Sequence, residues 1–125
     1  MKKLTKKQLT QIHNRCLNLV RRKPVEFFIF KKMKKYEGSC NWTDIEIDPR
    51  TNLLSTAYHE CVHYLYPDWS ETQVLYTESR LINCLSVLDI TKFLKCLAIK
   101  LYMGELQKNK FKKRKKKKIY KKSKQ

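Results

Sequence analysis

The first half of the chain changes from a helical pattern to two short patterns typical of strands. Apolar residues recur every three or four positions from Leu4 to Val20, which predicts a helix that Thr5 can cap. Residues 25–30 (VEFFIF) form an apolar run suited to a buried strand. Residues 41–48 (NWTDIEID) alternate between apolar and polar positions, as in a strand with one covered face.

The second half has helical spacing almost throughout. Prolines and capping residues divide it into three segments. The first covers about 53–66 and ends before Pro67; the second begins at Asp68 or Ser70 and reaches about Leu88; the third begins at Asp89 or Thr91 and reaches about Met103, where Gly104 is expected to end it.

These elements predict an α+β fold with a short antiparallel sheet between helices, which has two strands or is otherwise small. One domain is expected over residues 1–107. Residues 108–125 (KNKFKKRKKKKIYKKSKQ) cannot supply a core, and we expect them to form a disordered basic tail.

Charge is distributed very unevenly along the 125 residues, whose formal net charge is +18. Residues 1–35 contain 12 basic residues and one acid, and residues 108–125 contain 12 basic residues and no acid. The centre, residues 36–107, has 10 acidic residues against 5 basic ones. The positive net charge therefore comes from two basic flanks around a mildly acidic centre, and the candidate site described below lies in that centre.

The five cysteines include no CxxC pair and no zinc-knuckle spacing. Three of them lie in apolar helical patterns, where a free thiol behaves as a small hydrophobic side chain. This use of cysteine predicts a reducing, intracellular location. No apolar run is long enough for a membrane span, so we expect no membrane partner.

The most informative motif is His59-Glu60-Cys61-Val62-His63, an HExxH sequence inside the predicted helix at 53–66. Histidines four residues apart lie on one helix face and can bind one zinc ion, while the intervening glutamate can act as general base on a water molecule. At 100° per residue, the two histidines fall opposite the apolar stripe of the same helix. This position favours a site over two histidines packed in a core.

A catalytic zinc site needs a third protein ligand, and the next helix offers Glu71 and Glu78. Both fall on its apolar stripe, where a carboxylate is costly unless it is paired or binds a metal. Glu71 is the preferred ligand. It can instead complete a capping box that starts at Asp68, although Ser70 can cap the helix and leave Glu71 available. Glu78 is the alternative ligand, or it orients a ligand histidine.

The segment TNLLSTAYHECVHYLYPDWSETQV, with the strand and Asp-Pro-Arg turn before it, resembles the active-site region of small zincin-like metallopeptidases of bacteriophages and bacteria. The resemblance covers residues 40–80 and does not reach the first helix or the tail. It implies a minimal zincin-like fold in which His59, His63 and Glu71 bind Zn²⁺ and Glu60 is the general base. The chain differs from longer zincin motifs because no histidine follows His63.

The sequence therefore predicts a zinc-dependent peptidase that hydrolyses peptide bonds, with the strand at 41–48 lining the cleft and pairing with an extended peptide. The alternative is a non-catalytic nucleic-acid-binding protein with a structural or degenerate zinc site. A peptidase localised to nucleic acid by its tail would combine the two. The residues expected to contact phosphates without sequence preference are Lys112, Lys113, Arg114, Lys115, Lys116, Lys117 and Lys118.

Overall fold

The computed structural model describes the backbone of residues 1–50 and 52–123, and the side chains of these residues apart from 111 and 114–123. The chain belongs to the α+β class, with four α-helices and a three-stranded sheet in its described part. The elements follow in the order α1 (Lys6–Arg22), η1 (Val25–Phe27), β1 (Phe28–Phe30), β2 (Gly38–Cys40), β3 (Ile45–Ile47), α2 (Leu53–Leu65), α3 (Glu71–Cys84) and α4 (Val87–Ser123).

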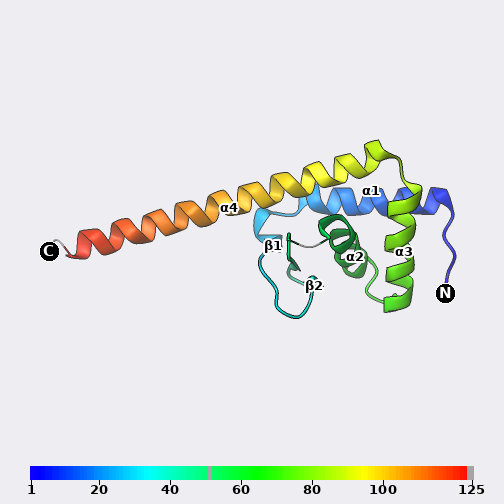
Figure 1. Cartoon of the computed structure of the whole chain (residues 1–125), viewed down its shortest axis with the longest axis horizontal. Coiled ribbons are helices and arrows are strands. Elements are labelled where there is room, and N and C mark those ends of the chain that lie inside the picture. Colours follow the sequence, from blue (N-terminus) through cyan, green and yellow to red (C-terminus); the bar gives the residue numbers. More distant parts are fainter. Residues whose placement is uncertain (51, 124–125) are drawn as a thin grey trace.

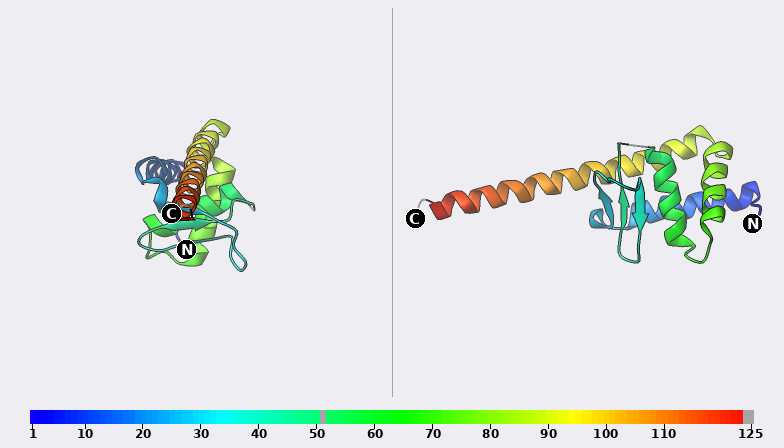
Figure 2. Two further views of the ribbon diagram at one scale, coloured as in Figure 1. Left: turned by 90° about the vertical axis from the view of Figure 1, so that its left-hand side faces the viewer. Right: turned by 60° about the horizontal axis from the view of Figure 1, so that its bottom comes forward.

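Two long helices support the rest of the molecule. α1 and α4 lie side by side, and α4 continues far beyond the other elements (Figure 1). The sheet, α2 and α3 stand next to one another across these two helices (Figure 2, right). α2 is therefore enclosed by the sheet on one side and by α3 on the other.

The first helix forms as its pattern predicts. Thr5 accepts a hydrogen bond from the backbone N–H of Gln8, and the Gln8 side chain accepts one from the N–H of Thr5. This capping box satisfies two backbone donors that a helix start otherwise leaves unpaired. The apolar positions of the helix are buried, among them Leu9, Cys16 and Val20.

The sheet differs from the prediction in strand number and direction. Its order is β1-β3-β2, with β1 parallel to β3 and β2 antiparallel to β3. The sheet is small, as predicted, but the prediction that it is antiparallel throughout is wrong. β2 was missed because Gly38-Ser39-Cys40 has no apolar alternation, and its pairing with β3 is decided by the tight return of the chain at residues 41–44. The central position of β3 also excludes the predicted role of residues 41–48 as the strand that pairs with substrate.

The turn between the sheet and α2 is fixed by Asp48, whose side chain is buried. Its carboxylate accepts hydrogen bonds from the Met33 N–H at 2.9 Å and from the Arg50 guanidinium at 2.7 Å. The bonds from Arg50 and Met33 hold the pKa of Asp48 well below its usual range. This anchored turn sets the position at which α2 begins.

Behind α2, the core joins this helix to α1 and α4. The Tyr58 ring stacks on Phe93 of α4 at a centroid distance of 4.1 Å, and its hydroxyl lies 2.8 Å from His13 Nδ1 on α1. Burial raises the pKa of Tyr58 and lowers that of His13, so we assign the Tyr58 hydroxyl as the donor and neutral imidazole as the acceptor. With Tyr58 fixed on this side, the opposite face of α2 points toward α3 and the sheet.

The end of α3 and both ends of α4 differ from the predicted boundaries. α3 ends at Cys84, and Ser86 rather than Asp89 or Thr91 starts the next helix, since its hydroxyl accepts a bond from the Asp89 N–H at 3.1 Å. α4 also runs through Gly104, where the sequence placed its end. A glycine inside a helix costs about 1 kcal/mol relative to alanine, and packing against η1 and β1 offsets that cost here.

The predicted disordered tail, residues 108–125, overlaps the end of α4, whose backbone is helical to Ser123. Most side chains of this segment lie outside the described part. Lys108 does not belong to a detached tail, because its Nζ donates to the Phe30 carbonyl at 3.2 Å. Among the described helices, none has the length and apolar character needed to cross a membrane.

Candidate metal centre

The two motif histidines lie on the open face of α2, as the helical wheel predicts. Tyr58 and Cys61 on the opposite face are fully buried, whereas the side chains of His59 and His63 keep 15% and 25% of their surface exposed. Their rings meet edge to face at a centroid distance of 4.7 Å. The two imidazoles are therefore neighbours that solvent can reach.

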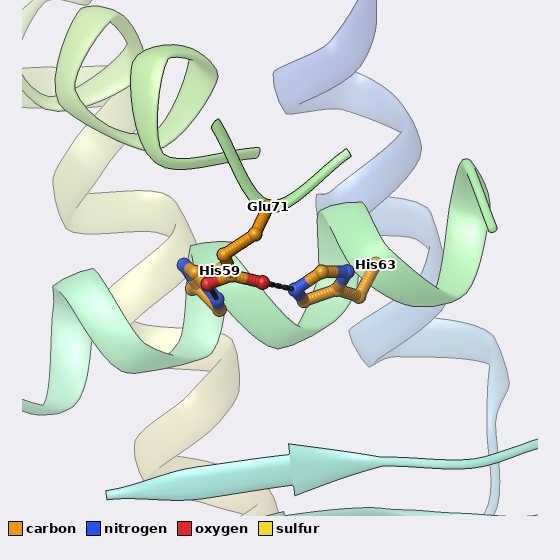
Figure 3. Close-up of side chains that lie close together, drawn as sticks. All are labelled: His59, His63 and Glu71. Carbon is orange, nitrogen blue, oxygen red and sulfur yellow. Dashed lines mark hydrogen bonds and ion pairs between the residues drawn. The ribbon is translucent and has the colours of Figure 1, made fainter. Parts of the chain in front are cut away.

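Glu71 reaches both rings from the start of α3 (Figure 3). One carboxylate oxygen lies 2.8 Å from His59 Nε2 and the other lies 2.7 Å from His63 Nε2. Ser70 caps α3 by accepting a bond from the Gln73 N–H at 3.2 Å, which leaves the Glu71 side chain available. Of the two capping arrangements that the sequence allowed, the structure contains the one that starts at Ser70.

These three residues can hold a metal ion. One potential ligand atom from each of them lies within 4.8 Å of the other two. With zinc–ligand bonds of about 2.0–2.1 Å, tetrahedral ligands lie roughly 3.3 Å apart. The oxygens of Glu71 lie closer than that to each Nε2, at 2.8 and 2.7 Å, so its carboxylate would have to move outward to admit an ion. The Glu71 side chain is 60% exposed and has room for this shift.

Glu78 contacts the other nitrogen of His59. Its Oε2 lies 2.7 Å from His59 Nδ1, and its Oε1 accepts a hydrogen bond from Ser55 Oγ. This geometry places Glu78 beside the histidine and away from the point where the two Nε2 atoms converge. The bond to Glu78, followed by the charge of Glu71, raises the pKa of His59 despite partial burial of the ring.

We call His59, His63 and Glu71 the triad. Glu60 projects toward the sheet beside the triad and is only 7% exposed. Burial raises the pKa of its carboxyl group. Gly38 of β2 makes this position available, because a Cβ atom there would lie 3.0 Å from Glu60 Cγ and 2.7 Å from Thr56 Cγ2. The glycine thus lets the strand pass directly over the helix.

The free edge of β2 borders the triad. The Asn41 N–H bonds the Asp44 carbonyl at 3.0 Å and the Asp48 N–H bonds the Glu37 carbonyl at 2.8 Å, so odd-numbered residues of this strand face β3. The backbone groups of Gly38 and Cys40 therefore point away from the sheet. Within the described residues, no further strand pairs with this edge.

Two hollows open on either side of the triad along this edge. One has a volume of about 340 Å³ and includes Gly38, His59 and Glu60 in its lining. The other has a volume of about 210 Å³ and includes Cys40 and His63. Together with the strand edge, they give an extended molecule a path across the candidate centre.

The structure thus brings His59, His63 and Glu71 together and sets Glu60 and Glu78 next to them. The predicted phosphate-binding residues do not take part in this site. Lys112 and Lys113 are exposed on the part of α4 that leaves the body (Figure 1), and residues 114–118 lie outside the described side chains. No sequence pattern pointed to Ser55 or Gly38, because their roles depend on contacts with distant residues.

No family model, curated protein or solved structure matches this chain.

Proposed function

We propose that this protein is a zinc-dependent peptidase. The observation that carries the proposal is the convergence of two imidazole Nε2 atoms and the Glu71 carboxylate beside the buried Glu60. Two histidines and one carboxylate with an open fourth position are a common ligand set of catalytic zinc. The HExxH spacing of His59, Glu60 and His63 on α2 supports the same assignment.

When bound, zinc supplies Lewis acidity that lowers the pKa of water and polarises a carbonyl group. Glu78 holds the Nδ1 proton of His59, which directs the Nε2 lone pair toward the centre. Ser55 donates to Glu78 and fixes this carboxylate in turn. These two residues act as positioning groups for His59.

Glu60 is the general base of the proposed reaction. It accepts the proton of the attacking water and passes it to the leaving amine. Its raised pKa suits both steps, because a base works best when its pKa lies close to the working pH.

The open edge of β2 orients the peptide. Gly38 and Cys40 offer outward N–H and C=O groups, which can pair with an extended chain as a neighbouring strand does. The bonds to the main chain fix the scissile carbonyl relative to Glu60 without selecting any side chain.

Glu60→Gln tests the proposal. The substitution keeps the shape of the side chain but removes the base, so hydrolysis of a broad peptide panel should fall by about 10²- to 10⁴-fold while zinc content remains unchanged. Glu105→Gln on α4 is the matched control and should leave the rate unchanged. If wild type and Glu60→Gln hydrolyse the panel equally, the peptidase assignment is wrong.

A second candidate function is nucleic-acid binding, favoured by the exposed Lys110, Lys112 and Lys113 on the projecting part of α4. Phosphate contacts by such lysines release counterions, so affinity should decrease steeply with salt. Removing residues 110–125 should weaken binding to double-stranded DNA and reduce its salt dependence, while the zinc content stays the same. Equal DNA affinity without these residues would exclude this role.

A further inference from the structure

The larger hollow beside the triad has walls of two kinds. Its volume is about 340 Å³, and it is formed by the segment before β2, by α2 and by Leu75 of α3. Tyr36 and Leu75 are apolar or aromatic side chains in its lining, and they are 62% and 51% exposed. Large exposed side chains that line a hollow beside a candidate active centre provide apolar contact area for a ligand.

The same hollow is acidic. Glu37 lines it and has no ion-pair partner within 4 Å in the part of the chain that the structure describes, although the whole chain has 29 basic residues. Thr56 Oγ1 donates to Glu37 Oε2 at 3.3 Å and holds the carboxylate against the wall of α2. Lys35 also lines the hollow, but its ammonium group lies over the Tyr36 ring at 5.5 Å from the centroid.

Glu60 provides a second observation at this hollow. It is only 7% exposed, it lines the hollow, and its carboxylate has no hydrogen-bond partner among the described residues. A buried carboxylate without a partner is costly unless a ligand or water completes its environment. The hollow is thus continuous with the group that we propose as the general base.

We infer that this hollow receives a lysine or arginine side chain of the peptide substrate and that Glu37 is the residue that selects it. The inference rests on the proposed peptidase function and adds a substrate class to it. The aliphatic stem of lysine or arginine packs on Leu75 and Tyr36, and the charged end meets Glu37. A long side chain with an apolar stem and a cationic end matches both kinds of wall.

The opposite charge should be rejected. A glutamate in the hollow would face the carboxylates of Glu37, Glu60 and Glu78, and the basic side chains in the same lining are Lys35 and His59. Norleucine has a lysine-like stem without the ammonium group, so it keeps the apolar contacts and loses the ion pair. These three side chains therefore separate the contribution of the charge from that of the stem.

The first measurement uses peptide pools in which lysine, norleucine or glutamate occupies one fixed position while the other positions are randomised. Hydrolysis by the zinc-loaded wild-type protein should favour lysine over norleucine by roughly three- to tenfold at one position beside the cleaved bond. Glutamate should be the poorest of the three. Equal cleavage of the three pools at every position would overturn the inference.

Substitution of Glu37 assigns the selection to this residue. Glu37→Gln should bring the lysine-to-norleucine ratio close to one, and Glu37→Lys should make glutamate preferred over lysine. Glu105→Gln removes an acid elsewhere on the surface and should leave the ratio as in wild type. A lysine preference that survives in Glu37→Lys would show that another residue selects the side chain.

Binding separates this inference from the proposed function. Fluorescent peptides with the three side chains are titrated with zinc-loaded Glu60→Gln, and anisotropy reports their Kd. If no peptide is hydrolysed by wild type, the peptidase proposal fails, whereas tighter binding of the lysine peptide still supports the pocket. If peptides are hydrolysed but the three bind equally, or none binds, the pocket assignment fails while the peptidase proposal stands.

Discussion

The two outer strands of the sheet are equally short but have very different surroundings. β1 is covered by α4, whose Lys108 Nζ donates to the outward carbonyl of Phe30. β2 has no such cover in the described part of the chain, and its outward backbone groups border the triad. The closed edge lies beneath a lysine-rich helix, whereas the open edge faces Glu37, Glu60 and Glu78.

This difference separates a structural edge from a functional one. An uncovered strand edge invites pairing with other chains, and proteins usually block it. Here the blocked edge is the one remote from the triad. In the function that we propose, the open edge is where the peptide binds, and its exposure would then serve recognition.

Among the changes that compare the two edges, blocking the open edge itself should have the largest effect. Cys40→Pro removes one outward N–H while the bonds between β2 and β3 involve the neighbouring residues. We expect peptide hydrolysis to fall by about tenfold or more, because one main-chain bond to substrate is lost and the ring obstructs pairing. Zinc content and the circular dichroism spectrum should match those of wild type. Hydrolysis at the wild-type rate would show that substrate does not pair with β2.

The two glycines of the chain allow a comparison of stability. Gly38 lies in β2 at the open edge, and Gly104 lies in α4, which covers the other edge. Gly38→Ala places a Cβ atom 2.7 Å from Thr56 Cγ2 and 3.1 Å from the Glu46 carbonyl, so β2 must move and we expect a loss of about 1–3 kcal/mol. Gly104→Ala meets only Val25 Cγ1, at 3.6 Å, and should stabilise α4 by about 0.5–1 kcal/mol. Urea denaturation measures both values. A neutral Gly38→Ala would contradict the close approach of β2 to α2.

A smaller effect should appear in the pH dependence of the metal-free protein. The pKa of His59 is raised by Glu78 and Glu71, so its protonated form stabilises the fold fully below the ordinary pKa of about 6.5. This contribution is lost as the pH rises through the folded-state pKa, and Tm should therefore fall over that range. Glu60 also lowers Tm as the pH rises, but over a lower pH range. Its pKa is raised in the fold, so ionising its carboxyl group there costs stability.

Zinc should reverse this trend, since it replaces the proton on His59 Nε2 and binds more tightly as the pH rises. The comparison is made by thermal unfolding with chelator and with excess zinc across pH 5.5–8.5. His59→Asn should remove the decline that occurs in chelator. An identical pH profile in this variant would show that His59 does not cause it.

Much of the α-helical structure could be predicted because it depends on local signals. Thr5 and Ser70 cap their helices, and the two motif histidines lie opposite the buried Tyr58. The predicted proximity of Glu71 and Glu78 to these histidines is also present. Periodicity and capping chemistry are sufficient for such features, since each involves residues within a few turns.

The features that the sequence did not reveal depend on contacts between distant segments. β2 exists because it pairs with β3 and passes over α2 at Gly38, and no apolar pattern marks it. Gly104 is typical of a helix end, but α4 remains helical there because it packs against the segment that includes Val25. The side of His59 that Glu78 contacts depends likewise on how α3 packs against α2.

Binding of one zinc ion by His59, His63 and Glu71 can be measured directly. Elemental analysis is done on the purified protein and on His59→Ala after dialysis against a weak chelator. We expect close to one zinc per wild-type chain and a loss of most of it in His59→Ala, with the helical content of the variant unchanged. Absence of zinc from wild type, or equal zinc in the two proteins, would contradict it.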